Sequence, residues 1–246
     1  MNKDGIIIIT GGSRGIGAAI ASALLRAGYR IACLSRSGAL PAMGDSALLT
    51  DRCKAFSCDV TRPDSMRAAF DQIAALGYPV VGLVNNAGIH LEGPSKSFSL
   101  EDYDTVFDTN AKAVLIASQC AYPFLEAGGG LIVNIGSFFD KMGVKRNLAY
   151  CASKAAVAAM TRCLAVEWAS KGINVMNVAP GYIVTDLNKE AMESGPLRTY
   201  LEKRIPRGTP GTSAEVANVV ATLYATDTSF LTGETIYIDG AQGIAH

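Results

Sequence analysis

Short apolar runs alternate along the chain with longer segments in which apolar residues recur at helical spacing. Runs typical of buried strands lie at 5–10, 29–34, 53–60, 80–84, 131–135, 173–178 and 236–238. Helical patterns lie at 18–27, 63–76, 99–127 and 148–170. Because buried strands that alternate with helices pair in parallel, the pattern predicts an α/β fold, with a mostly parallel sheet covered on both faces.

The ends of two helices carry residues that are typical of caps. Thr61 is expected to cap the helix over 63–76, and Ser99 the helix over 99–127. We expect the second helix to continue past Asn110 and to stop at the three glycines that follow residue 127. Residues 37–51, with scattered glycine and proline, are predicted to form a loop or a ragged helix.

The first predicted strand leads directly into a glycine-rich turn. Gly11, Gly15 and Gly17 lie between this strand and a helix that stops at Gly28. Glycines in this place let the backbone approach a pyrophosphate, whose charge the helix dipole and the free N–H groups favour. Their spacing is wider than that of the common dinucleotide fingerprint and indicates a subset of such folds.

Tyr150 and Lys154 are four residues apart in a predicted helix, so their side chains share one face. An ammonium beside a phenol stabilises the tyrosinate, and we expect it to lower the tyrosine pKa toward the range of acid-base catalysis. The alternative is that the two residues are only neighbours on a solvated face.

Length and charge narrow the class of protein. The 246 residues are expected to form one domain, 1–246, and 22 basic residues balance 22 acidic ones. This balance gives no electrostatic case for nucleic acid or an anionic membrane as a partner. No apolar run is long enough for a signal peptide or a membrane span, so we expect a soluble, cytoplasmic protein. Six dispersed cysteines and two histidines predict no metal site.

Five motifs follow one another in an order that resembles the short-chain dehydrogenase/reductase family, over essentially the whole length. They are Thr10-Gly11-x-x-x-Gly15-x-Gly17, Asn85-Asn86-Ala87-Gly88, Asn110, Ser137 with Tyr150-x-x-x-Lys154, and Pro180-Gly181-x-x-x-Thr185. The resemblance implies a single-domain Rossmann-type doubly wound parallel sheet and an enzyme that interconverts a carbonyl and an alcohol by hydride transfer with a nicotinamide cofactor.

The resemblance also implies roles for four catalytic residues. Tyr150 would donate a proton to the carbonyl oxygen, and Lys154 would lower the tyrosine pKa and hold the nicotinamide ribose. Ser137 would hydrogen-bond the same oxygen. Asn110 would interrupt its helix and hold a water that links Lys154 to solvent. The alternatives are that Ser137 caps a turn and that Asn110 is ordinary helix surface.

The implied cofactor contacts lie at the ends of the predicted strands. Asp59 and Val60 would meet the adenine, although Asp59 could instead merely end its strand. Ile183 and Thr185 would hold the carboxamide. The complete set of expected cofactor residues is Gly11, Ser13, Arg14, Gly15, Ile16, Gly17, Ser35, Arg36, Asp59, Val60, Asn86, Ala87, Gly88, Tyr150, Lys154, Pro180, Gly181, Ile183 and Thr185.

The residues after the second strand favour NADP(H) over NAD(H). Enzymes that prefer NAD place an acidic residue there, whereas this chain has Ser35 and Arg36. Arg36 can bind a 2′-phosphate with a charge-assisted fork, and Arg14 offers a second cation. The alternative is that Arg14 pairs with a local carboxylate and Arg36 points to solvent.

The substrate is expected to be a ketone or secondary alcohol of the 3-oxoacyl or small carbonyl class. The expected pocket walls are His90, Leu91, residues 138–144, Tyr182 and a lid at about 186–206. The resemblance is closest to the 3-oxoacyl carrier-protein reductases and related carbonyl reductases. Two departures are the glycines at 128–130, in place of a basic residue, and Ala241, in place of a glycine.

Two other functions stay open, an NAD-dependent sugar, polyol or other alcohol dehydrogenase and a non-catalytic NADP-sensing regulatory protein. The expected partner is a small-molecule carbonyl or alcohol substrate, with neither nucleic acid nor membrane. Helices rich in small residues at 111–121 and 152–165 predict a homotetramer, or a dimer, although these faces could instead be buried within one subunit.

Overall fold

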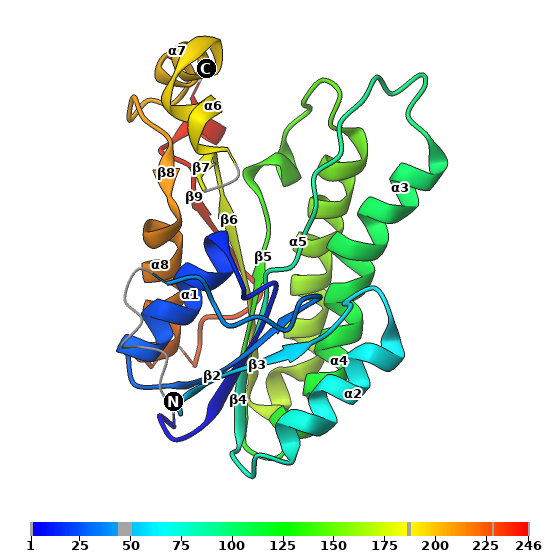
Figure 1. The fold of residues 1–246 in the computed structure, drawn as a ribbon, viewed down its shortest axis with the longest axis vertical. Helices are drawn as coiled ribbons and strands as arrows, with labels where there is room; N and C mark the ends of the chain where they lie inside the picture. The colour runs from blue at the N-terminus through cyan, green and yellow to red at the C-terminus, as the bar shows by residue number, and fades with distance from the viewer. Residues whose placement is uncertain (1, 44–50, 186–187, 228, 246) are drawn as a thin grey trace.

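A computed structural model describes residues 2–43, 51–185, 188–227 and 229–245, and its centre is one parallel sheet (Figure 1). The seven strands have the order β3-β2-β1-β4-β5-β6-β9, and every neighbouring pair is parallel. Their bounds are Ile6–Thr10 for β1, Arg30–Ser35 for β2, Cys53–Ser57 for β3, Val80–Asn85 for β4, Gly130–Ile135 for β5, Ile173–Pro180 for β6 and Thr235–Ile238 for β9. The predicted doubly wound parallel sheet is therefore confirmed.

Helices cover both faces of this sheet, as Figure 1 shows. On one face lie α1 (Gly15–Arg26) and α8 (Ser213–Ala225). On the other lie α2 (Pro63–Ala74), α4 (Ala113–Glu126) and α5 (Leu148–Trp168), with α3 (Leu100–Phe107) leading into α4. Among the helices in the described ranges, none is both long enough and apolar enough to cross a membrane.

The first strand shows why both faces must be covered. Ile7 and Ile9 pack into the core beneath α1 and α8, whereas Ile6 and Ile8 pack into the core beneath α2, α4 and α5. Successive side chains of a strand point to opposite faces, so an uninterrupted apolar run is stable only when each face has its own layer.

Helix α8 has no counterpart among the predicted elements, although its sequence carries the signals. Thr212 and Glu215 form a reciprocal capping box, with the Thr212 side chain accepting from the Glu215 N–H. Val216, Val220 and Leu223 recur at helical spacing and are buried. The sequence after residue 212 therefore carries the usual signals of a helix, although this helix was not among the predicted elements.

Several predicted boundaries change in the structure. The Ser99 cap is confirmed, because its side chain accepts from the Asp102 N–H. The Thr61 cap is wrong, since α2 begins after Arg62 and the Thr61 hydroxyl hydrogen-bonds Asp59 instead. The third strand ends at Ser57, before the predicted residue 60. The helix predicted over 99–127 is divided by a π-helical turn, Asp108–Lys112.

Short elements extend the fold beyond the carboxyl ends of the strands. Strands β7 (Ile183–Val184) and β8 (Gly211–Thr212) pair in parallel, and α6 (Lys189–Glu193) and α7 (Gly195–Arg204) lie beyond them (Figure 1). Of the predicted lid, residues 186–187 lie outside the described residues, as do residues 44–50 of the predicted loop. Single-turn helices occupy Phe138–Lys141, Ala169–Lys171 and Gln242–Ile244.

Tyr224 fastens α8 to the sheet through its buried phenol. The hydroxyl lies 3.1 Å from the Leu83 carbonyl oxygen and 2.9 Å from that of Leu131, so it joins α8 to β4 and β5. A side chain at Gly82 would collide with this ring, because a Cβ there would lie 2.4 Å from Cε1. Glycine is therefore required where the ring crosses the strand.

Replacing Tyr224 with Phe removes this hydroxyl and leaves two buried carbonyl oxygens without the donor. We expect Tyr224→Phe to lower the free energy of unfolding by about 1–3 kcal/mol, measured by urea denaturation. The matched control is Tyr78→Phe, at a partly exposed ring whose hydroxyl has no hydrogen bond among the described residues. Equal stabilities of the two variants would contradict the proposed anchoring.

Candidate active site

The glycine-rich turn lies between β1 and α1 as predicted. Gly11 and Gly15 have φ angles of +65° and +57°, which L side chains rarely adopt. Gly17 packs closely against the turn, since a Cβ at this position would lie 2.3 Å from the Gly11 carbonyl oxygen. Helix α1 has no side-chain cap at Arg14, so its first N–H groups are available to an anion.

A second segment, residues 86–88 after β4, is bound to this turn. The Thr10 hydroxyl oxygen accepts from the backbone N–H groups of Asn86 and Ala87, at 3.0 and 3.1 Å. The Asn86 side chain donates to the Thr10 and Gly11 carbonyl oxygens, at 3.0 and 3.1 Å. Asn86 therefore holds the two loops together through its side chain.

Tyr150 and Lys154 lie on α5, where the lysine is buried. The Lys154 Nζ donates to the Ile135 carbonyl oxygen at 2.8 Å and lies 5.7 Å from the centre of the Tyr150 ring. Burial lowers the pKa of Lys154 to about 8. Gly88 packs beside this group, since a Cβ on it would lie 3.7 Å from Nζ. The segment after β4 and helix α5 therefore meet at this lysine.

The direction predicted for the Tyr150 pKa is wrong in this structure. Burial raises the pKa of the phenol, and a hydrogen bond with the Ser137 side chain lowers it by less. Removing a phenolate from water costs more than this single hydrogen bond returns. The neutral, proton-bearing form of Tyr150 is therefore favoured.

Ser137 lies two residues after the end of β5 and is buried. Its hydroxyl hydrogen-bonds the Tyr150 side chain, and its oxygen also accepts from the Phe139 N–H at 3.3 Å, capping the short helix Phe138–Lys141. The turn cap, which the sequence left open as an alternative to a contact with the carbonyl oxygen, is present, and Ser137 contacts the tyrosine as well.

Asn110 lies in the π-helical turn and is almost fully buried, so the surface alternative is wrong. Its side chain accepts from the Ile89 N–H at 2.8 Å and donates to the Ile89 carbonyl oxygen at 2.9 Å and to the Ser153 hydroxyl at 3.1 Å. The Ser153 hydroxyl in turn donates to the Tyr150 carbonyl oxygen at 2.8 Å. Asn110 thus joins the loop after β4 to the helix that carries the tyrosine.

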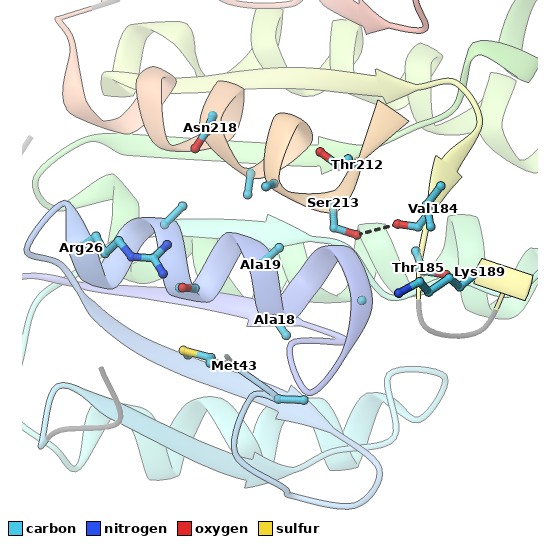
Figure 2. A pocket seen from close by; sticks show the side chains of 16 residues that line it. Ala18, Ala19, Arg26, Met43, Val184, Thr185, Lys189, Thr212, Ser213 and Asn218 are labelled. Atoms are coloured by element: carbon cyan, nitrogen blue, oxygen red, sulfur yellow. Dashed lines mark hydrogen bonds between the residues drawn. The ribbon is translucent and has the colours of Figure 1, made fainter. Parts of the chain in front are cut away.

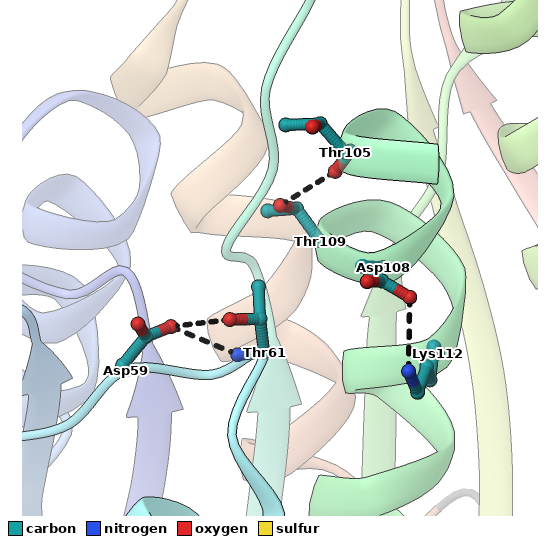
Figure 3. Close-up of polar contacts among 6 residues, drawn as sticks. All are labelled: Asp59, Thr61, Thr105, Asp108, Thr109 and Lys112. Carbon is teal, nitrogen blue, oxygen red and sulfur yellow. Dashed lines mark hydrogen bonds and ion pairs between the residues drawn. The ribbon is translucent and has the colours of Figure 1, made fainter. Parts of the chain in front are cut away.

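The outer side of this turn is solvated. Figure 3 shows Thr109 donating to the Thr105 carbonyl oxygen and Lys112 paired with Asp108, at 3.0 Å for the ion pair. These contacts run along the exposed face while Asn110 points inward. A π turn contains one more residue than an α-helical turn. Here it lets the Asn110 side chain point inward while the helix continues.

A buried amide network, which the sequence analysis missed, attaches α5 to the sheet. The Asn85 Nδ2 donates to the Asn134 Oδ1 at 2.9 Å and to the Ser118 hydroxyl at 3.2 Å. The Asn134 Nδ2 donates to the Thr161 hydroxyl at 2.9 Å, and these residues are fully or nearly fully buried. The available signal was the presence of asparagines inside two apolar strands, since buried amides need partners.

The adenine side of the predicted site is built around Asp59. Its Oδ1 accepts from the Thr61 N–H at 3.0 Å and from the Thr61 hydroxyl at 2.7 Å (Figure 3). These bonds, with a smaller contribution from Arg36, hold the pKa of Asp59 below its usual value. Arg14 and Arg36 are exposed, and neither forms an ion pair within the described ranges. The alternative in which Arg14 pairs with a local carboxylate is therefore not found among these residues.

A cavity of about 420 Å³ begins beside the glycine-rich turn. Figure 2 shows it between α1 and α8, with Thr185 and Ser213 at one end and Arg26 at the other. The Ser213 hydroxyl donates to the Val184 carbonyl oxygen at 3.3 Å. None of Ser137, Tyr150 and Lys154 lines this cavity, which is therefore separate from the predicted catalytic residues.

Tertiary structure brings most of the predicted residues to one edge of the sheet. The glycine-rich turn, residues 86–88, Ser137 and residues 180–185 follow the carboxyl ends of β1, β4, β5 and β6, which are consecutive neighbours. Ligands of open α/β sheets bind at this edge. Pro180 is the last residue of β6, and Gly181 packs on Asp239, while Ile183 is buried.

Comparison with known proteins agrees with this arrangement. A family model described as enoyl-(acyl carrier protein) reductase matches residues 11–241. D-threitol dehydrogenase of Mycolicibacterium smegmatis is 35% identical, over 97% of this chain and 93% of that protein. The 3-oxoacyl-[acyl-carrier-protein] reductase of Homo sapiens is 35% identical, over 96% of this chain and 97% of that protein.

Among solved structures, gluconate 5-dehydrogenase of Burkholderia cenocepacia, in complex with NADP and tartrate, superposes with a TM-score of 0.88. It is 29% identical, and the match covers 98% of this chain and 96% of that one. The sheet order, the five ordered motifs and these full-length matches lead to the same conclusion. The chain belongs to the short-chain dehydrogenase/reductase family of oxidoreductases, which act on CH–OH donors.

Proposed function

We propose that this enzyme interconverts a ketone and a secondary alcohol with NADP(H), using Tyr150 as the proton donor and acceptor. The observation that carries the proposal is the Tyr150 phenol, hydrogen-bonded by Ser137 beside a buried Lys154 at the carboxyl edge of the sheet. NADPH, when bound, supplies the hydride to the carbonyl carbon. Tyr150 gives its proton to the carbonyl oxygen, so that one hydride and one proton complete the alcohol.

Each supporting residue has a defined part in moving this proton. Because burial keeps Tyr150 neutral, the phenol carries its proton when the substrate arrives. Ser137 hydrogen-bonds the phenol and stabilises the charge that develops on the carbonyl oxygen of the substrate. Lys154, with a pKa of about 8, is largely protonated at neutral pH and stabilises the tyrosinate that remains. Asn110 holds this group of loops in register.

The charges at the adenosine end support NADP(H) as the cofactor. Arg36 follows Ser35 at the end of β2, and Arg14 lies in the glycine-rich turn. Both guanidinium groups are exposed, and neither has an ion-pair partner among the described residues. A 2′-phosphate would therefore meet two available cations. The NADP complex of the related gluconate 5-dehydrogenase agrees with this assignment. We assign the adenine contact to Asp59 and Val60.

The complete set of acid-base residues favours an enzyme over a non-catalytic sensor of NADP. Carrier-protein and small polyol substrates both occur in the names of the relatives. We infer a small carbonyl substrate, since a glycine run at 128–130 replaces the basic residue expected for a carrier protein. Ala241 has a φ of +70°, so it keeps the backbone shape of the glycine it replaces.

The domain organisation, the lid and the cellular location are part of the same proposal. We assign residues 1–246 to one domain, with α6 and α7 as the lid that closes over the substrate. Met192, Leu201 and Ile205 give this segment a small apolar cluster of its own, which fits a unit that moves as a whole. The six cysteines are free thiols, which fits the reducing cytoplasm.

Homotetramer formation is proposed through the outer faces of α4 and α5. Leu115 on α4 is 38% exposed, and Val166 on α5 is 82% exposed. Helix α5 also carries many small residues. An apolar helical face of this kind is stabilised by packing against a second copy.

Ala159→Arg places a cation on this face and should reduce the assembly to smaller species in sedimentation velocity. The control Ala68→Arg, on the exposed side of α2, should leave the assembly intact; equal masses for both variants would contradict the interface.

Tyr150→Phe tests the proton donor directly. Loss of general acid catalysis should lower kcat for NADPH-dependent ketone reduction by about 10²–10⁴-fold, with NADPH binding retained. Turnover is followed by the loss of reduced-cofactor absorbance over a ketone panel, and binding by cofactor fluorescence. The matched control Tyr78→Phe alters a surface ring and should keep the parent kcat. Full activity of Tyr150→Phe would exclude the mechanism.

Arg36→Ala tests the choice between the two cofactors. Removal of a charge-assisted contact should raise KM for NADPH by about tenfold or more, because such bonds contribute about 1.5–3 kcal/mol. KM for NADH should stay unchanged, since NADH has no 2′-phosphate. Arg67→Ala, at an exposed arginine of α2 paired with Asp64, is the control. If KM for NADPH equals that of the parent, the assignment of Arg36 is wrong.

A further inference from the structure

His90 packs directly against the catalytic tyrosine. The centres of the His90 and Tyr150 rings are 4.7 Å apart, with 57° between their planes. The preceding residue, Ile89, has both of its backbone polar groups bound by Asn110. The backbone that carries the imidazole is therefore fixed by a residue of the catalytic set.

A buried asparagine determines which imidazole nitrogen carries the proton. The Asn147 Nδ2 donates to the Lys145 carbonyl oxygen at 2.9 Å, so the Oδ1 must be the atom that faces His90. This oxygen contacts the His90 Nε2 and can only accept. Nε2 therefore carries the hydrogen, and the Nδ1 of the neutral ring is a hydrogen-bond acceptor.

Two further contacts hold the His90 loop against the loop before α5. The Gly93 N–H donates to the Arg146 carbonyl oxygen at 2.8 Å, and the Arg146 Nε lies 3.4 Å from the Glu92 Oε1. Arg146 has a φ of +68°, a conformation that is unfavourable for a residue with a side chain. Backbone strain kept beside a catalytic helix indicates that this loop geometry is maintained for the site.

The other ring that packs on Tyr150 is apolar. Phe139 is buried and meets Tyr150 edge to face, with 6.0 Å between ring centres, and Phe138 is buried behind it. His90 is exposed, and across the described part of the chain its only hydrogen bond is the one to Asn147. Since Nε2 is bound to Asn147, the polar atom that this exposed ring has left for a ligand is the Nδ1 acceptor.

The geometry points to His90 as the residue that selects a substrate with a hydroxyl group on the carbon next to the reacting carbonyl. The Nδ1 accepts a hydrogen bond from this hydroxyl while Tyr150 holds the carbonyl oxygen. The substrate class is then the α-hydroxyketones, and hydride and proton transfer convert them to vicinal diols. This inference rests on the proposed function and names the substrate class of the same site.

The test compares hydroxyacetone with methoxyacetone, both with NADPH. Each ketone has an oxygen on the neighbouring carbon, but only hydroxyacetone can donate a hydrogen bond from it. The parent enzyme should prefer hydroxyacetone by about tenfold or more in kcat/KM, since a site built to bind a hydroxyl discriminates strongly against an analogue without it. In His90→Phe, which keeps a ring against Tyr150 and removes the acceptor, this ratio should fall toward one.

Two further variants separate loss of the His90 hydrogen-bond acceptor from general effects of a substitution on this loop. His90→Gln restores an acceptor oxygen and should recover part of the preference. Lys96→Gln, at an exposed lysine farther along the same loop, is the control and should keep the full ratio. A parent enzyme that reduces both ketones with equal kcat/KM, or a His90→Phe variant with the parent ratio, would overturn the inference and leave the proposed function standing. No reduction of any ketone by the parent would instead refute the proposed function.

Discussion

The side-chain amide of Asn110 is the contact on which the geometry of the site depends. It binds the N–H and carbonyl of Ile89 and the hydroxyl of Ser153, so one group joins the loop after β4, the helix that carries Tyr150 and its own π-helical turn. Buried amides are costly without partners, and here the bonds go to two other elements, the loop after β4 and α5. A shift of any of these elements would break one of the bonds, which makes the relative position of loop and helix unique.

Burial determines the protonation states at this site. Lys154 is removed from water and has one carbonyl partner, which lowers its pKa to about 8. Tyr150 is driven toward its neutral form by the same effect. In the proposed reaction, proton donation by Tyr150 would leave a tyrosinate near the Lys154 ammonium, and opposite charges attract strongly in a medium of low polarity.

Parallel pairing explains why distant motifs meet. The ends of β1, β4, β5 and β6 are neighbours at one edge, and the loops that follow them carry the glycine-rich turn, residues 86–88, Ser137 and residues 180–185. The rigid sheet positions these loops, and the Asn85–Asn134–Thr161 network attaches α5 to the same strands. Loops after the strands can therefore vary in the side chains that pack on Tyr150, as His90 and Phe139 do, while the position of Tyr150 on α5 stays fixed.

Local patterns in the sequence were sufficient for the sheet, for most helices, for the glycine-rich turn and for the shared face of Tyr150 and Lys154, because each depends on neighbours within a few residues. Helix α8 was equally predictable from its capping box and apolar spacing, but was left out. Only tertiary structure decided the π turn at Asn110, the partner of Thr61, the raised pKa of Tyr150 and the contact of His90 with Asn147. These features depend on burial and on residues distant along the chain, and no local pattern encodes which side chains will lose their water.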